Sequence, residues 1–239
     1  MKFLKNPVNP NDVQRNLTFA TTQHGYSIDD HFTGTPITPW QLTIAVGIAF
    51  ILLFLTFFVQ IANFWVGILL TSVVLGFLTL AWGDVHINRE HLSAVNILIA
   101  VASALILYLI FFLGKLLLAM LFPAVDEFTL SLYQLTSSLS PIIGGLLIFF
   151  IIAPVEELFW RGFVQHNMQA FLGRELGLVL ASILYALAHV CSLNPLLVIA
   201  ALFGGLFWGV LYQLRGNLFL VILSHAIWSI LIFAILPLA

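Results

Sequence analysis

The sequence WQLTIAVGIAFILLFLTFFVQIANFWVGILLTSVVLGFLTLAW, from Trp40 to Trp82, contains no aspartate, glutamate, lysine or arginine. A helix that crosses the hydrocarbon core of a bilayer needs about 20 mostly apolar residues. This stretch is long enough for two such helices, which we predict at 40–62 and 64–82. The short link NFW joins them closely, so we expect a helical hairpin inside a membrane.

The rest of the chain has the same character. Of its 239 residues, 62% are hydrophobic and 8% are charged, and the mean hydropathy is +1.11. Soluble domains contain about 45–50% apolar and about 25% charged residues. We therefore predict an all-α membrane protein, a polytopic bundle of about seven transmembrane helices plus a short interfacial helix at 125–139. The five further spans are expected at 92–122, 140–168, 175–192, 195–213 and 217–237.

The chain divides into a polar N-terminal tail, 1–39, and a transmembrane helical domain, 40–239. The tail has no apolar segment like that of a cleavable signal peptide, and its composition indicates loose order. Its His24 and His31 are interpreted as solvated side chains. The single Cys191 forms no internal disulfide and is interpreted as a packing residue. The net charge of -2 and the lack of a basic patch argue against a nucleic-acid partner.

The charges in the loops predict the orientation of the spans. Cytoplasmic loops carry an excess of lysine and arginine. With seven spans, the positively charged loop residues all fall on the N-terminal side: Lys2, Lys5, Arg15, Arg89, Arg174 and Arg215. We predict a cytoplasmic N-terminus and an external C-terminus, provided that the third span is unbroken at Lys115. A prokaryotic cytoplasmic membrane is expected, with the endoplasmic reticulum as the eukaryotic alternative.

Five ionisable residues are predicted to lie inside the membrane. Glu156, Glu157 and Arg161 are on the fourth span, His189 is on the fifth and His225 is on the seventh. Ionised groups are costly there and indicate a functional site by default. At about 1.5 Å per residue, Glu156 and His189 lie roughly 20 Å, and His225 about 12 Å, from the predicted cytoplasmic ends. Groups from three helices thus reach a similar depth, which predicts a polar cluster.

Local spacing divides the charges of the fourth span. Glu157 and Arg161 are four residues apart, in the order that favours an ion pair on one helix face. Glu156 is turned by about 100° and is expected to face the two histidines. Pro154, just before them, removes a backbone hydrogen bond and predicts a kink.

Helical spacing also places a hydroxyl beside each histidine. Tyr185 shares a helix face with His189, and Ser229 shares one with His225. On the sixth span a set of small residues is interpreted as a surface for close helix packing: Gly204, Gly205 and Gly209.

A buried carboxylate beside an imidazole can deprotonate a water molecule, and a second histidine with a hydroxyl can stabilise an oxyanion. These parts predict water attack on an amide or ester. Zinc is an alternative, with Glu156, His189 and His225 as three protein ligands. Proton-coupled transport and a purely structural polar network also use such clusters. The residues alone leave these alternatives open, and also the oligomeric state.

Three motifs carry a family resemblance. EELFWR (156–161), YALAH (185–189) and HAIWS (225–229) resemble the signature motifs of the CPBP family, the CAAX prenyl proteases of type II and their bacterial relatives, which include bacteriocin self-immunity proteins. The resemblance covers about 140–237, the expected catalytic core. It implies an intramembrane endopeptidase, whose partners are membrane lipid and a membrane-associated, possibly prenylated, peptide or protein. A non-catalytic, immunity-type relative is the alternative.

The resemblance also implies roles for individual residues. Glu156 would be the catalytic glutamate, His189 would position the attacking water, and His225 would help to form the oxyanion site. Glu157 and Arg161 match the other charged positions of the first motif. The family has been described both as metalloproteases and as glutamate proteases; we expect the metal-free chemistry, with no cofactor. Two positions depart from the family pattern: Tyr185 replaces a usual phenylalanine, and Ser229 replaces a common asparagine.

Overall fold

The structure is a computed structural model that describes residues 37–83 and 92–238. Within these residues it contains seven helices that are long and apolar enough to cross a membrane, and it contains no strand there. The predicted all-α membrane fold is therefore confirmed. The spans are Pro39–Val59, Phe64–Trp82, Ala94–Leu121, Pro141–Leu172, Arg174–Ser192, Pro195–Arg215 and Leu218–Ile235. The predicted tail, its histidines and Arg89 lie outside the described residues, apart from 37–39.

Polar caps explain where the spans begin. The first backbone N–H groups of a helix have no partner within the helix, and a side-chain oxygen at the N-cap can accept from them. Thr38 accepts from the N–H of Gln41 and receives its side chain in return, which is a capping box. Five further spans or helices begin with similar caps: Asn63, Ser93, Ser140, Asn194 and Asn217.

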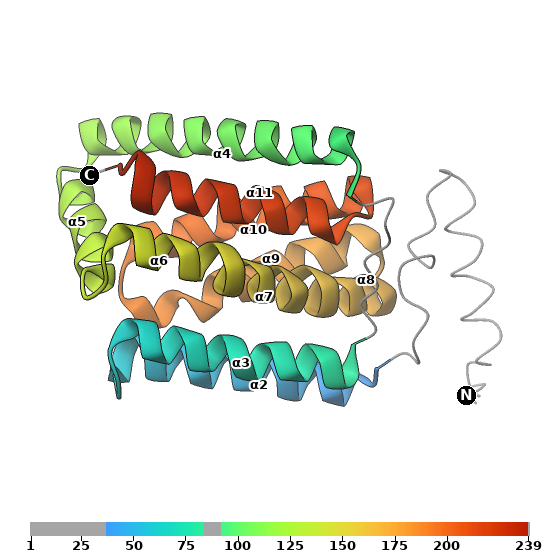
Figure 1. Cartoon of the computed structure of the whole chain (residues 1–239). Coiled ribbons are helices and arrows are strands. Elements are labelled where there is room, and N and C mark those ends of the chain that lie inside the picture. Colours follow the sequence, from blue (N-terminus) through green and yellow to red (C-terminus); the bar gives the residue numbers. More distant parts are fainter. Residues whose placement is uncertain (1–36, 84–91, 239) are drawn as a thin grey trace, which may run out of the picture.

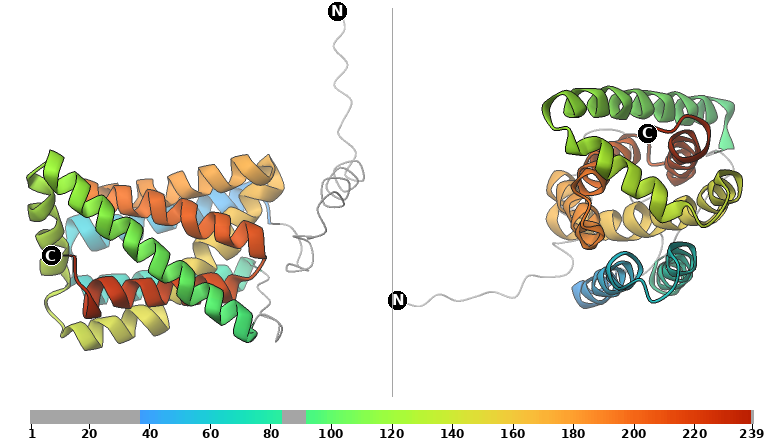
Figure 2. Two further views of the ribbon diagram at one scale, coloured as in Figure 1. Left: turned by 90° about the horizontal axis from the view of Figure 1, so that it is seen from above. Right: turned by 90° about the vertical axis from the view of Figure 1, so that its left-hand side faces the viewer.

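The spans lie roughly along one direction, and a short helix crosses one end of the bundle (Figures 1 and 2). α2 (Pro39–Phe54) and α3 (Phe64–Trp82) form the predicted hairpin on one side, with extensive contacts between them. α4 (Ala94–Leu121) lies on the opposite side and packs against α11 (Leu218–Ile230). Between them lie α9 (Arg174–Ala188), α10 (Pro195–Arg215) and the fourth span. The fourth span carries Glu156, Glu157 and Arg161, His189 directly follows α9, and His225 is on α11.

The crossing helix is α5 (Ala124–Thr136), at the position of the predicted interfacial helix. α4 is continuous through Lys115, so the third span is not split. Lys115 instead forms an ion pair with Asp126 in the first turn of α5, with 2.7 Å between Nζ and the carboxylate. This pair joins the end of α4 to α5.

The fourth span is not a uniform α-helix. It consists of α6 (Pro141–Leu147), a wider π-helical stretch η4 (Ile148–Ile152), α7 (Ala153–Glu157), a second π-helical stretch η5 (Leu158–Gln165) and α8 (His166–Leu172). Pro154 lies in the first turn of α7, between the two wide stretches. The interruption expected at Pro154 therefore takes the form of π-helical turns on both sides. Such turns occur frequently at functional sites.

Candidate active site

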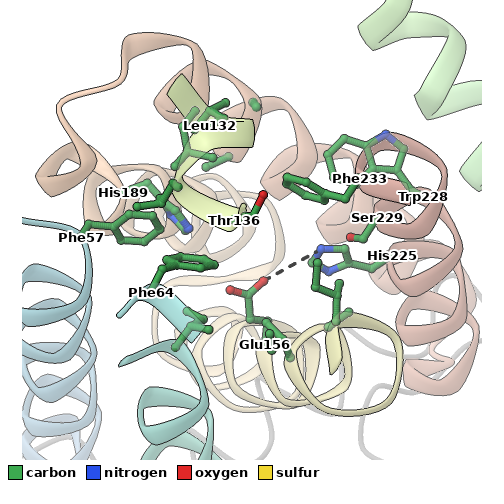
Figure 3. A pocket seen from close by; sticks show the side chains of 18 of the residues that line it. Phe57, Phe64, Leu132, Thr136, Glu156, His189, His225, Trp228, Ser229 and Phe233 are labelled. Carbon is green, nitrogen blue, oxygen red and sulfur yellow. Dashed lines mark ion pairs between the residues drawn. The ribbon is translucent and has the colours of Figure 1, made fainter. Parts of the chain in front are cut away.

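A cavity of about 140 Å³ lies beside α5, which contributes Leu132, Leu135 and Thr136 to its wall. Its walls include Glu156 from the fourth span, Tyr185 and His189 from α9, and His225 and Ser229 from α11. The structure thus brings together residues from three spans that lie far apart in the sequence. Figure 3 shows His189 and His225 on opposite sides of the cavity, with the carboxylate of Glu156 between them.

Glu156 has two polar neighbours. The hydroxyl of Tyr185 donates a hydrogen bond to Oε2 of Glu156 over 3.2 Å. Nε2 of His225 lies 3.9 Å from the same oxygen (Figure 3). The side chain of Glu156 is 16% exposed, more than that of Glu157, which is completely buried. Of the two adjacent glutamates, Glu156 is the one whose carboxylate lines the cavity.

Glu157 contacts both Arg161 and His225. The predicted ion pair with Arg161 is present, with 3.0 Å between Nη1 and Oε1. The same oxygen also lies 2.6 Å from Nδ1 of His225. From the sequence, Glu157 and Arg161 were expected to pair separately, with His225 facing Glu156 alone. The structure corrects this division, because α11 packs against α7 and places His225 within reach of both glutamates.

The contact with Glu157 defines the protonation of His225. A carboxylate oxygen only accepts, so Nδ1 of His225 must carry the proton in this hydrogen bond. Nε2 then faces Glu156 and the cavity. Trp208 of α10 stacks on the imidazole, with ring centroids 3.9 Å apart and an interplanar angle of 22°. The imidazole is therefore fixed both at its edge and on its face.

Trp208 is itself anchored by a polar pair that the sequence analysis did not single out. Its indole Nε1 donates to Oγ of Ser224 over 3.3 Å. Ser103 of α4 donates to the same hydroxyl over 2.8 Å. Ser224 directly precedes His225 in the sequence SHAIWS, so its position next to a motif histidine could have marked it as a candidate. Ser103 carried no signal, because its partner is 121 residues away.

Arg161 extends the network to α10. Its Nη2 donates to the backbone carbonyls of Gly204 and Gly205 over 3.3 and 3.5 Å. Its guanidinium also lies over the ring of Tyr185, 4.8 Å from the centroid. A Cβ on Gly205 would lie 3.3 Å from side-chain atoms of α9. The glycines therefore allow close packing, as predicted, and they also expose carbonyl acceptors, which the sequence analysis missed.

His189 is oriented by the backbone. It follows α9 directly, and its Nδ1 lies 2.8 Å from the carbonyl oxygen of Tyr185. A carbonyl oxygen only accepts, so Nδ1 carries the proton and the other ring nitrogen, Nε2, is left as an acceptor. His189 and Glu156 both line the cavity. Among the described residues, no direct hydrogen bond joins them.

The described residues contain no group of three histidine, cysteine, aspartate or glutamate side chains that could hold a metal ion. The set proposed as a zinc alternative, Glu156, His189 and His225, surrounds the cavity without converging as ligands. Cys191 does not line this cavity, and its thiol donates to the carbonyl of Ala188 over 3.1 Å. That contact fits the predicted packing role.

Comparison with known families identifies the segment that carries these residues. Residues 138–231 match the model of the Rce1-like type II CAAX prenyl endopeptidases. This segment is similar to the Rce1-like family. The resemblance predicted from the three motifs is thereby confirmed. Comparisons with curated proteins and with solved structures gave no match.

The Rce1-like segment runs from just before α6 into the end of the seventh span, and it contains every candidate site residue. The match suggests a CAAX-type intramembrane protease, in keeping with a multi-pass integral membrane protein. Parts of the chain before this segment also contribute to the cavity wall: Phe57, Phe64 and Ile68 from the hairpin and Leu132, Leu135 and Thr136 from α5. The N-terminal spans therefore help to shape the site.

Proposed function

We propose that the protein is an intramembrane endopeptidase in which Glu156 and His189 activate a water molecule for attack on a peptide bond. The observation that carries the proposal is the position of the Glu156 carboxylate, between two histidines on the wall of one cavity. Glu156 would accept the proton of the water, and Nε2 of His189 would accept a hydrogen bond that orients it. A positioned general base contributes roughly 10²- to 10⁴-fold to a rate.

His225 and Ser229 would stabilise the tetrahedral intermediate. When both ring nitrogens of His225 are protonated, Nδ1 donates to Glu157 and Nε2 donates into the cavity. A fixed donor at the place where negative charge develops stabilises the transition state. The hydroxyl of Ser229, one helical turn further along α11, lines the same wall and can supply a second donor. After collapse of the intermediate, protonated Glu156 would return the proton to the leaving amine.

A second cavity supports a substrate with an apolar chain. It has a volume of about 270 Å³ and lies beside the first, between α4, α5, α10 and α11. Most of its wall is aliphatic or aromatic, with Lys115, Thr129 and Tyr133 as the polar exceptions. The two cavities share several wall residues: Leu132, Leu197, Ala200, Trp228 and Phe233. A prenyl-type group in the second cavity would place the adjoining peptide near Glu156.

The orientation in the membrane remains a proposal from the sequence. Arg174 and Arg215 lie at the end of the bundle opposite α5, where Pro39 also begins the first span (Figure 1). If positive charge marks the cytoplasmic side, the N-terminus is cytoplasmic, and the cavity lies toward the other face. A reporter fused after Ala239 tests this: a cytoplasmic signal from the reporter would contradict it.

The proposed activity is tested with the purified full-length protein in detergent. The substrates are a prenylated CAAX peptide and a panel of unprenylated membrane peptides, with cleavage followed by mass spectrometry. Glu156→Gln and His189→Ala should lose cleavage, whereas the matched control Glu127→Gln, on the exposed face of α5, should retain it. Full cleavage by Glu156→Gln would show that the carboxylate has only a structural role. Loss of cleavage with a chelator, restored by zinc, would contradict the metal-free mechanism.

A further inference from the structure

Tyr185 forms hydrogen bonds with both residues of the proposed water-activating pair, Glu156 and His189. Its side-chain hydroxyl donates to Oε2 of Glu156 over 3.2 Å. Its backbone carbonyl lies 2.8 Å from Nδ1 of His189, one helical turn further along α9. One residue thus touches a carboxylate on the fourth span and an imidazole at the end of α9.

The ring of Tyr185 is held on several sides. Trp160 contacts it with ring centroids 5.3 Å apart, and the imidazole of His189 does so at 4.8 Å. The guanidinium of Arg161 lies 4.8 Å from the ring centroid. A Cβ added at Gly205 would approach the ring to 3.3 Å. The residue is 6% exposed, so the hydroxyl has little freedom to leave Glu156.

We propose that Tyr185 is a positioning residue, whose hydroxyl fixes the rotamer of Glu156 and whose carbonyl fixes the tautomer and orientation of His189. This inference rests on the proposed function. With Oε2 engaged by the hydroxyl, Oε1 of Glu156 remains the oxygen that receives the proton of water. With Nδ1 of His189 engaged by the carbonyl, Nε2 remains the acceptor that faces the cavity.

The Tyr185 hydroxyl should affect catalysis because few other contacts fix the position of the Glu156 carboxylate. Among the described residues, the Tyr185 hydroxyl is the only hydrogen-bond donor to Glu156, and His225 at 3.9 Å is too far for a hydrogen bond. Hydrogen bonds to ionised groups are among the stronger ones in proteins. Without that bond, the carboxylate can rotate about its side-chain torsions and spend less time in the reactive geometry. A misplacement of this kind lowers the rate of the chemical step.

The test compares Tyr185→Phe with Tyr212→Phe in the full-length protein. Both variants remove one hydroxyl from a buried tyrosine, and Tyr212 on α10 does not line the cavity. For a peptide that the wild type cleaves, Tyr185→Phe should lower kcat roughly tenfold or more, while KM and the thermal unfolding midpoint stay at wild-type values. Tyr212→Phe should leave kcat unchanged. A loss in kcat alone is the expected signature of a group that acts only on the chemical step.

Three other results would overturn the inference. Unchanged kcat in Tyr185→Phe would show that the hydroxyl does not position the base. A raised KM with unchanged kcat would assign the hydroxyl to substrate binding. A fall in kcat together with a lowered thermal unfolding midpoint would mean that the hydroxyl has a structural role only. The proposed function fails separately, namely if Glu156→Gln cleaves normally.

Discussion

Glu157 and His225 are joined by a contact of 2.6 Å between Oε1 and Nδ1, although 68 residues separate them in the chain. This contact links the fourth and seventh spans in the middle of the bundle. It also gives the two adjacent glutamates different tasks. Glu157 holds Arg161 and His225 in place, while Glu156 lines the cavity.

The first prediction concerns this difference. Glu157→Gln should lower the free energy of unfolding by about 3–5 kcal/mol, because it leaves Arg161 as a buried charge without its counterion. Glu156→Gln should abolish cleavage with little loss of stability, since its side chain is partly exposed and pairs with a neutral hydroxyl. Thermal unfolding in detergent and peptide cleavage, measured on both variants, separate the two effects. Equal stability of the two variants would contradict this division of tasks.

The second prediction concerns the close contact of α9 and α10. Gly205→Ala should lower both stability and cleavage, because the new methyl group would lie 3.3 Å from side-chain atoms of Ser182 and Tyr185. The matched control is Gly47→Ala on α2, where nothing lies within 4 Å of the added atom and which lines neither cavity. The control should gain up to about 1 kcal/mol from its higher helix propensity. A stable, fully active Gly205→Ala protein would mean that the two helices can separate without affecting the site.

The third prediction concerns the support behind His225. Ser224→Ala should cost about 1–3 kcal/mol of stability, because Trp208 Nε1 is left buried without an acceptor. Cleavage should fall as well, since the indole ring that stacks on His225 loses its anchor. Ser137→Ala, on an exposed turn after α5, is the control for removal of a serine hydroxyl. Equal stability and equal cleavage in Ser224→Ala and Ser137→Ala would contradict the prediction.

The fourth prediction concerns the attachment of α5. Asn194 caps α10, and its amide also donates to the carbonyl of Phe128 and the hydroxyl of Ser131 over 2.8 and 2.9 Å. Asn194→Ala should therefore destabilise the start of α10 by about 0.5–2 kcal/mol and loosen α5. Hydrogen exchange should become faster in 124–136 and stay unchanged in α2. Protection of α5 equal to the wild type would show that its remaining contacts suffice.

The sequence predicted the number and approximate limits of the spans, because a bilayer requires long apolar segments and leaves few alternatives. The charged pair Glu157 and Arg161 was predictable for a similar reason, since helix geometry fixes neighbours four residues apart. The cost of ionised groups inside a membrane singled out Glu156, His189 and His225, and the three motifs then named the same residues. Each of these inferences depends on local spacing or on a known pattern.

Contacts between distant residues could not be predicted in this way. The hydrogen bond between Glu157 and His225 depends on how α11 rotates against α7, which no local pattern specifies. The carbonyls of Gly204 and Gly205 are backbone atoms, so no side chain in the sequence marks them as acceptors. The π-helical stretches were also unexpected, because their apolar residues look the same as those of an α-helix.

These π-helical stretches affect how the fourth span tolerates changes of length. In an α-helix each residue advances the direction of the side chains by about 100°, so losing one residue normally turns everything that follows. A π-helical turn contains one residue more than an α-helical turn. Deleting one codon between Ile148 and Ile152 would therefore let this stretch close into an α-helix, with Glu156, Glu157 and Arg161 still directed toward α9 and α11. In a library of random variants, this segment should accept single-residue deletions as well as substitutions, unlike a span of uniform α-helix.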